Sequence, residues 1–138
     1  MDKALNYLAL AKKGRLIELG EEPVGAITRA VKGRLVIVAA DASDHTWRRA
    51  KSFVAGTDQQ CLRVPFSKEE LGFVVGRTSL AIAAFTDVAM ALAFVKALPD
   101  QEKVKEVRET LDAKSKKLRQ RKDEAKAHER NVRMGKKK

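Results

Sequence analysis

The stretch Leu35-Val-Ile-Val-Ala-Ala-Asp-Ala-Ser43 decides the fold of this chain. Its first six residues are apolar and rich in β-branched side chains, a pattern typical of a strand buried on both faces. Apolar residues recur at helical spacing on both sides of it, through Val24 and Ile27 before the strand and through Trp47 and Ala50 after it. A buried strand between two amphipathic helices predicts an α/β protein.

The same alternation continues outward in both directions. The capping box Ser67-x-x-Glu70 opens a short helix, and Asp87 caps a nearly all-apolar one. Gly14 is expected to end the first helix. The first helix is expected around Leu5, Leu8 and Ala9, the short helix after Ser67 to end near Gly72 to Gly76, the helix after Asp87 to run to Leu98, and strands to cover residues 16–19, 61–66 and 80–85. Residues 1–99 are therefore predicted to form a three-layer α/β/α sandwich with a small mixed sheet, although the pattern does not give the strand order.

The composition changes near Pro99. Residues 1–99 carry 14 basic and 10 acidic side chains, whereas residues 100–138 carry 15 and 8. We therefore place a boundary at residue 99, between a compact domain over 1–99 and a basic extension over 100–138. A single long helix with Asp100 as its N-cap is expected for this C-terminal extension.

Apolar residues repeat every seven positions in the extension, at Val104, Leu111, Leu118, Ala125 and Val132. The matching half of a coiled-coil seam turns polar after one heptad, so we expect the first turns to dock on the domain and the rest to form a basic arm. Cations of such an arm neutralise nucleic-acid phosphates and release counterions. The expected phosphate contacts are Lys114, Lys116, Lys117, Arg119, Arg121 and Lys122.

Composition excludes several classes of protein. The 29 basic and 18 acidic residues give a net charge of +11, which favours a polyanionic partner. Cys61 is the single cysteine, which excludes a disulfide scaffold, and with His45 and His128 it is the whole supply of soft metal ligands. The longest apolar run is eight residues, too short for a membrane helix, and no secretory leader opens the chain. We expect a soluble, cytoplasmic protein without a metal, a cofactor or a membrane association.

Two features offer catalytic chemistry. Asp41 to His45 follow a buried strand at its carboxyl end, where open α/β sheets bind ligands, but a helix cap by Ser43 or Asp44 explains the same residues. Cys61 lies in a strand pattern and is expected to be a core residue rather than a nucleophile. Because no nucleophile, base and oxyanion donor come together, we expect neither an enzyme nor a small-molecule substrate.

The segment Gly20-Glu-Glu-Pro-Val-Gly-Ala-Ile27 joins a strand to a helix N-terminus. Exposed amides there can meet a phosphate, and the carboxylates of Glu21 and Glu22 can accept hydrogen bonds from guanine N–H groups. The alternative is that both carboxylates only stabilise the positive end of the helix, by roughly 0.3–1 kcal/mol each. The segment alone leaves both interpretations open.

Several stretches, in order along the chain, carry a family resemblance. They are Lys3-Ala-Leu-Asn-Tyr-Leu-Ala-Leu-Ala-Lys-Lys-Gly14, Gly20-Glu-Glu with Ala26-Ile27, Leu35-Val-Ile-Val-Ala-Ala-Asp-Ala-Ser43, Val64-Pro-Phe-Ser-Lys-Glu-Glu-Leu-Gly72 and Ala81-Ile-Ala-Ala-Phe-Thr-Asp87. Through them residues 3–98 resemble the kink-turn-binding ribosomal-protein family (the L-seven-Ae and L-thirty-e group), most of all its bacterial ribosome-associated members. The resemblance implies an α/β/α sandwich that binds structured RNA, often a kink-turn, without catalysis.

In that family the turn entering the second helix reads the sheared G·A pairs of the kink with an Asn-Glu pair and a later lysine. Glu22 falls on the family's glutamate. Glu21 falls where an amide or a base is usual, and Gly25 falls where the lysine sits, so both departures remove a donor. The resemblance therefore implies an RNA-facing turn made of Gly20, Glu21, Glu22 and Gly25.

The family's second RNA-facing loop corresponds to Gly76-Arg-Thr-Ser79 and leads into Leu80. The resemblance implies that Gly76, Arg77, Thr78, Ser79 and Leu80 contact RNA, with Arg77 on a phosphate and Leu80 or Ala81 on an extruded base. The alternative is a plain turn between a helix and a strand, which the glycine serves equally well.

Basic side chains flank the first strand and the second helix and are expected to form one rim, namely Lys12, Lys13, Arg15, Arg29, Lys32 and Arg34. The sequence thus predicts a non-enzymatic protein that binds structured RNA, foremost ribosomal RNA, as a ribosomal or ribosome-associated protein beside ribosomal proteins. The rival is a protein-interaction adaptor of the same fold, with acidic residues at the turn meeting a basic partner and the tail serving as a nonspecific nucleic-acid arm. DNA binding by the tail alone is a third possibility.

Overall fold

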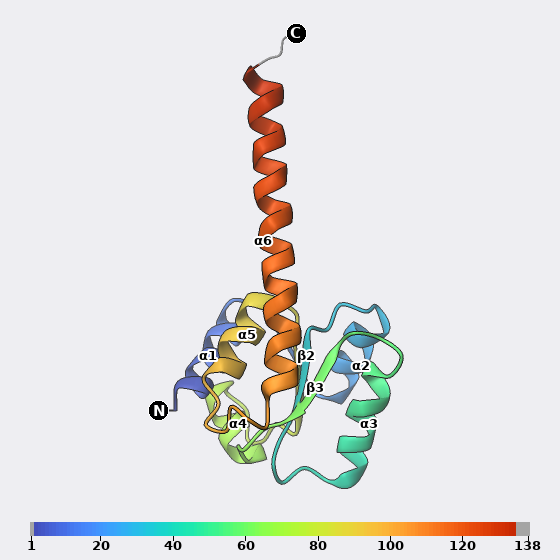
Figure 1. Cartoon of the computed structure of the whole chain (residues 1–138). Helices are drawn as coiled ribbons and strands as arrows, with labels where there is room; N and C mark the ends of the chain where they lie inside the picture. The colour runs from blue at the N-terminus through green and yellow to red at the C-terminus, as the bar shows by residue number, and fades with distance from the viewer. Residues whose placement is uncertain (1, 135–138) are drawn as a thin grey trace.

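The structure is a computed structural model that describes residues 2–134, and side chains up to residue 129. Over this range the elements follow one another as α1 (Lys3–Lys13), β1 (Ile17–Leu19), α2 (Glu21–Arg29), β2 (Leu35–Val38), α3 (Asp44–Val54), β3 (Gln60–Arg63), α4 (Lys68–Val74), β4 (Ile82–Phe85), α5 (Val88–Lys96) and α6 (Lys105–Met134). Helices α2 and α3 cover one face of the sheet, and α1, α4, α5 and the first turns of α6 lie on the other (Figure 1). The predicted α/β sandwich is confirmed, with a long C-terminal helix attached to it.

The sheet has the strand order β1-β4-β2-β3 and is mixed, as predicted. β2 pairs parallel with β3, while β4 runs antiparallel to both β1 and β2. Ile17, Phe85, Leu35 and Gln60 therefore form one row across the sheet. Two surfaces are defined by the ends of the strands. The surface where β1, β2 and β3 end and β4 begins is called the loop end, and the surface where β1, β2 and β3 begin and β4 ends, next to this row, is called the tail end.

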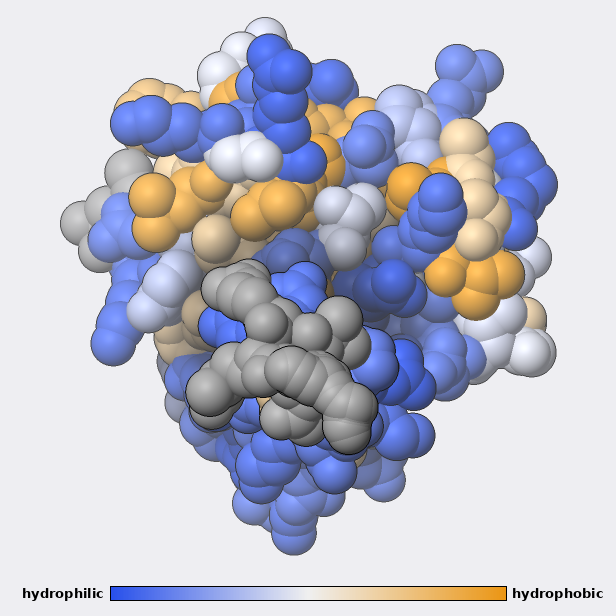
Figure 2. Space-filling model, turned by 90° about the horizontal axis from the view of Figure 1, so that it is seen from above, coloured by the Kyte–Doolittle hydropathy of each residue, from blue (hydrophilic) through white to orange (hydrophobic). Residues whose placement is uncertain are grey.

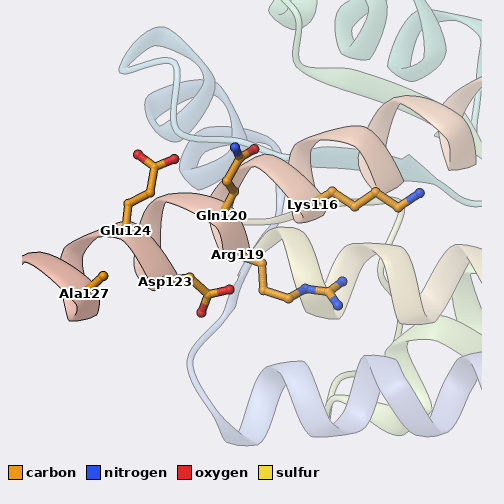
Figure 3. A pocket seen from close by; sticks show the side chains of 6 residues that line it. All are labelled: Lys116, Arg119, Gln120, Asp123, Glu124 and Ala127. Carbon is orange, nitrogen blue, oxygen red and sulfur yellow. The ribbon is translucent and has the colours of Figure 1, made fainter.

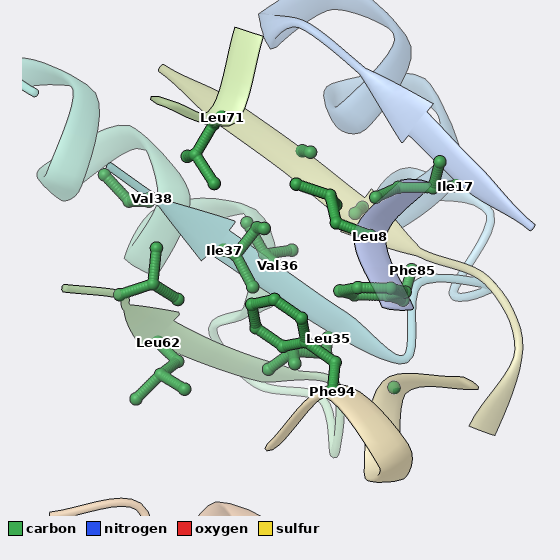
Figure 4. Packing of buried hydrophobic residues seen from close by; sticks show 14 of the residues in the cluster. Leu8, Ile17, Leu35, Val36, Ile37, Val38, Leu62, Leu71, Phe85 and Phe94 are labelled. Atoms are coloured by element: carbon green, nitrogen blue, oxygen red, sulfur yellow. The ribbon is translucent and has the colours of Figure 1, made fainter. Parts of the chain in front are cut away.

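The core surrounds β2, whose four residues are fully buried, as the apolar run predicts. Figure 4 shows Leu35 and Ile37 among side chains from both sheet faces. The rings of Phe85 and Phe94 tilt against each other with centroids 5.1 Å apart, a favourable aromatic geometry. This contact fixes α5 relative to β4.

Helix caps agree with the sequence except at α6, described below. Ser67 and Glu70 form the reciprocal capping box, and the Asp87 carboxylate accepts from the Met90 N–H at 2.9 Å. Gly14 has an ordinary φ of −85°, and the left-handed residue that closes α1 is Arg15, with φ 59°. Gly14 therefore ends α1 as predicted, and the left-handed position that follows it is occupied by an arginine, a residue that rarely adopts this conformation.

Helix α6 begins at Lys105, four residues later than an N-cap at Asp100 predicts, because residues 101–104 form turns in which the Asp100 carboxylate accepts from the Lys103 N–H. Val104 and Leu111 are buried in the core, whereas Leu118 is 41% exposed. The predicted docking of the first turns is thus confirmed, and the core continues past residue 99. Beyond the tail end the helix projects away from the domain (Figure 1). Val132 lies outside the residues with described side chains.

No helix within residues 2–134 combines the length and the apolar character that crossing a membrane requires.

Candidate nucleic-acid interface

Gly20 starts α2 with a backbone conformation that only glycine adopts readily. Its φ of 97° and ψ of 162° lie in a region nearly restricted to glycine. The Val24 N–H donates to the Gly20 carbonyl, and Pro23 has no N–H, so the free amides of this helix start belong to Glu21 and Glu22. Both glutamates are exposed at the loop end. The turn therefore presents acceptor side chains and donor backbone groups together.

The second predicted loop lies directly beside this turn. Gly76 is left-handed with φ 77°, and the Arg77 N–H donates to the Gly72 carbonyl, which closes α4 in a Schellman motif. The Arg77 guanidinium reaches the α2 turn, where Nη1 lies 3.6 Å from the position a Cβ on Gly20 would occupy. Two segments more than 50 residues apart in sequence thus form one surface at the loop end.

Gly72 makes this arrangement possible. A Cβ at this position would lie 2.7 Å from Ser79 Cα, 2.8 Å from Ser79 N and 2.9 Å from the Arg77 carbonyl oxygen. These are backbone atoms, which cannot move aside as a flexible side chain can. The sequence predicted only that a helix ends here, and it missed that Gly72 holds the Gly76–Ser79 loop in place.

Two hydrophobic residues of this region differ from expectation. Leu80 is 3% exposed and belongs to the core, so its side chain is removed from the set of proposed RNA contacts. Phe73, a large aromatic residue of the kind usually found in a core, is 76% exposed one turn before Arg77. The helical phase of Leu71 and Val75, which are buried, was the signal that could have placed Phe73 outside.

Gly25 does not leave an empty place where the family's lysine sits. A Cβ on Gly25 would lie 3.3 Å from the Phe53 ring and 3.2 Å from Arg29 Nη1. The Arg29 guanidinium, from one turn further along α2, therefore covers this position and brings a cation back to it. Glu21 is paired with Arg49 of α3, with Nη2 and Oε2 3.4 Å apart, and Arg49 also lies over the Phe53 ring. A groove between α2 and α3 thus mixes carboxylates with two arginines.

The predicted basic rim is divided by the structure. Lys13 and Arg15 end α1, and Lys32 precedes β2, so all three are exposed at the tail end. Arg29 lies at the same end of α2, but its guanidinium reaches back over Gly25. Most of the rim is therefore separated from Gly20 and Arg77 by the length of the sheet.

The predicted tail contacts also differ among themselves. Lys114 Nζ lies 3.1 Å from the Asp58 carboxylate and 3.0 Å from the Asp58 carbonyl oxygen, so it fastens α6 to the domain. This hydrogen bond and the charge of Lys114 hold the pKa of Asp58 below its usual range. Lys116 pairs with Asp112 one turn earlier on α6, and its hydrogen bond lowers the pKa of that carboxyl. Exposed positions further along the helix are Lys117, Arg119, Arg121 and Lys122.

One depression joins the basic helix to the domain. It is lined at the tail end by Arg34, Asp58, Asp87, Lys114, Lys117 and Arg121, with Thr86, Val88 and Leu118. Asp58 is paired with Lys114, and Asp87 accepts from the Met90 N–H of α5. Seen from the tail end, the projecting helix is largely hydrophilic, and the domain surface around it carries both hydrophilic and hydrophobic patches (Figure 2).

A second hollow runs along α6 itself. Lys116, Arg119, Gln120, Asp123, Glu124 and Ala127 line it, and all six are carried by this one helix (Figure 3). Because no other element supplies an opposing wall, it is the open flank of a helix and cannot enclose a small molecule.

The catalytic alternatives have structural explanations. The Asp41 carboxylate accepts from the Lys68 N–H at 2.8 Å, and Ser43 caps α3 as predicted by accepting from the Thr46 N–H. Burial raises the pKa of the Cys61 thiol to about 12, which keeps it protonated and unreactive at neutral pH. Within the described part of the chain, no three His, Cys, Asp or Glu side chains are grouped so that they could hold a metal ion.

Comparison with known proteins places the fold in a family. The chain is 32% identical over 75 residues to RNA-binding protein YlxQ of Enterococcus faecium, a match that covers 54% of this chain and 72% of YlxQ. A Bacillus halodurans protein of unknown function superposes with a TM-score of 0.67 at 22% identity, covering 72% of this chain and all of that one. The 15.5kD RNA binding protein of Giardia lamblia superposes with a TM-score of 0.52 at 20% identity, covering 69% and 81%. No protein-family model matches the chain.

The chain thus has the α/β architecture and the paired glycine turns described above, and its identity to YlxQ extends over most of that relative. It belongs to the L-seven-Ae family, in the bacterial group that includes YlxQ. Part of the chain has no counterpart in either structural neighbour, because both cover less than three quarters of it.

Proposed function

We propose that this protein binds structured RNA and performs no chemistry on it. One observation carries the proposal: the turn at Gly20 and the loop at Gly76, distant in sequence, meet at the loop end through Arg77. YlxQ and the Giardia neighbour are both named RNA-binding proteins, which supports the same ligand here and supports a non-enzymatic role.

The chemistry of this surface suits a distorted RNA helix better than a plain one. Glu22 is exposed and, in the structure, is not engaged by any ion pair among the described residues, so its carboxylate is available to guanine N–H groups. Arg77 supplies a cation for a phosphate next to it, and Arg29 supplies the cation that Gly25 lacks. We therefore propose a kink-turn or a similar G·A-containing bend as the ligand, within ribosomal RNA in the cytoplasm.

The test is binding of the full chain to a kink-turn RNA and to an equally long duplex without the G·A pairs. Wild type is expected to prefer the kink-turn, and Glu22→Gln to reduce that preference by about tenfold or more, because hydrogen bonds to a charged group contribute about 1.5–3 kcal/mol. Glu69→Gln is the matched control, since it removes an exposed carboxylate at the same end outside the two turns. Equal affinity for both RNAs would refute specific recognition of the kink-turn. If the protein bound neither RNA, RNA binding itself would be refuted, and the protein-interaction adaptor would be the favoured function.

Phe73 offers a second probe of the same surface. Stacking of a base on an aromatic ring contributes about 1–3 kcal/mol, so Phe73→Ala is expected to weaken kink-turn binding by roughly fivefold or more. Because the ring is 76% exposed, thermal unfolding should change little. Unchanged RNA affinity would remove Phe73 from the interface without touching the case for Glu22.

A further inference from the structure

The loop end and the tail end lie on opposite sides of the domain. The strands between them are three or four residues long, which at about 3.3 Å per residue separates the two ends by roughly 10–13 Å. Helix α6 then runs on from Lys114 to Met134, and at about 1.5 Å per residue this adds about 30 Å in the direction away from Gly20 (Figure 1). A rigid RNA seated on Arg77 therefore does not extend along the basic helix.

Charge is concentrated at the tail end. Its four segments, residues 10–17, 29–35, 55–59 and 86–87, contain six cations and two carboxylates. The two carboxylates, Asp58 and Asp87, are engaged by Lys114 and by the N-terminus of α5. On α6, residues 114–122 add six more cations and no carboxylate. The tail end is thus a polycationic surface whose acidic groups are already occupied.

Some of these cations line the depression between α6 and the domain. Arg34 from the domain and Lys117 and Arg121 from the helix line it together. No hydrogen bond or ion pair within the described residues engages these three side chains. Arg34 and α6 are fixed relative to each other because Lys114 binds Asp58 and Leu111 is buried. Three cations are therefore held on two walls of one depression, an arrangement that can neutralise phosphates of a nucleic-acid backbone.

We propose that the tail end binds the phosphate backbone of a second nucleic-acid segment, so that one protein molecule bridges two segments. This inference rests on the proposed function of the loop end. The partner is a nucleic acid rather than a membrane, because between Leu118 and Glu129 the apolar residues of the helix are Ala125 and Ala127, which provide no apolar face to insert. Recognition at the tail end depends on charge and not on base sequence, since no exposed aromatic ring lines the depression.

A two-step capture experiment tests the bridge. Kink-turn RNA is immobilised and loaded with full-length protein, unbound protein is washed away, and a labelled duplex of about 16 base pairs is added. Wild type is expected to retain the duplex, whether RNA or DNA, with a retention that falls steeply with salt. The variant Arg34→Gln/Lys117→Gln/Arg121→Gln should still load on the kink-turn but retain at least tenfold less duplex. Its salt slope should be smaller by about 2–3, one unit for each lost phosphate contact.

The control variant Lys3→Gln/Lys103→Gln/Lys105→Gln loses three positive charges, as the first variant does, but keeps the cations of the depression. It should therefore capture the duplex as wild type does. Wild type that fails to load on the kink-turn refutes the proposed function, whereas loading without duplex capture refutes only the bridge. Equal capture by both triple variants, or capture of RNA but not DNA, would overturn the charge-based site. Light scattering must find one protein chain in each bridged complex, because two chains would assign the bridge to a dimer.

Discussion

The two ends of the sheet differ in charge. The four segments at the loop end, residues 20–22, 39–44, 64–70 and 76–81, contain six carboxylates and two cations, whereas those at the tail end contain six cations and two carboxylates. A net charge of +11 therefore hides a polarity along the strand direction. Affinity for a nucleic acid and selectivity among nucleic acids are therefore expected to come from different ends of the domain. Acceptors suited to base edges lie at the loop end, and cations suited to phosphates lie at the tail end.

The backbone differs between the two ends as well. The loop end uses glycine where the chain needs positive φ, at Gly20 and Gly76. The tail end places Arg15 and Val31 in the left-handed region, with φ 59° and 56°, although glycine would be less strained there. At Arg15 this strain accompanies a cation on the basic surface. The tail end thus retains side chains that its local geometry disfavours.

The largest expected effect tests whether the tail is part of the folded unit. Leu111 is fully buried on α6, so Leu111→Ala should lower the free energy of unfolding by about 3 kcal/mol, through lost burial and the cavity left behind. Leu118→Ala changes the same stripe one heptad later, where the side chain is 41% exposed, and should cost less than about 0.5 kcal/mol. Denaturant unfolding measures both. Similar values for the two would mean that α6 is not docked, and the fixed tail-end depression would be lost with it.

The next effect concerns the loop end. In Gly72→Ala the new methyl group would meet backbone atoms of Arg77 and Ser79, so we expect a loss of about 2 kcal/mol and a displaced loop. Gly76→Ala has open space around its Cβ and bears only the strain of a positive φ, about 1 kcal/mol. Unfolding free energies and kink-turn affinity should both rank Gly72→Ala as the more damaging change. The reverse order would show that conformation, not the close approach, holds the loop.

These glycines also show what the sequence could and could not predict. Periodicity and caps predicted the layers and nearly every element, because the burial of β2 and the hydrogen bonds of Ser67 and Asp87 are local or follow from composition. The contact between Arg77 and Gly20 and the separation of Arg15 from both depend on strand order, which the pattern does not contain. The basic rim was therefore predicted as one surface, although Lys13, Arg15 and Lys32 lie at the tail end and the Arg29 guanidinium reaches back over Gly25.

A smaller effect, of opposite sign, is expected at the tail end. Val31→Gly should raise the free energy of unfolding by about 0.5 kcal/mol, because relief of left-handed strain exceeds the entropy that glycine adds to the unfolded chain. Val31→Ala keeps the strain and should not stabilise the protein. Thermal unfolding of the two variants separates the backbone effect from loss of the half-exposed side chain. A stabilisation by both would attribute the gain to the removed valine surface instead.

The smallest effect isolates the ion pair that fastens α6 to the tail end. Lys114 lowers the pKa of Asp58, so the pair stabilises the folded state above the unfolded pKa of about 4, and this contribution is lost as pH falls through the lower folded pKa. The Asp58 side chain is 74% exposed, so solvent screens the pair and Asp58→Asn should cost only about 0.3 kcal/mol at pH 7. Unfolding of wild type and variant at pH 7 and near pH 2.5 should give a difference that disappears at the lower pH and shrinks with salt. Lys114→Met should cost at least as much at pH 7, since it removes the same attraction together with the hydrogen bond to the Asp58 carbonyl. A difference between wild type and Asp58→Asn that persists at the lower pH would mean that the charge of Asp58 does not hold the helix in place.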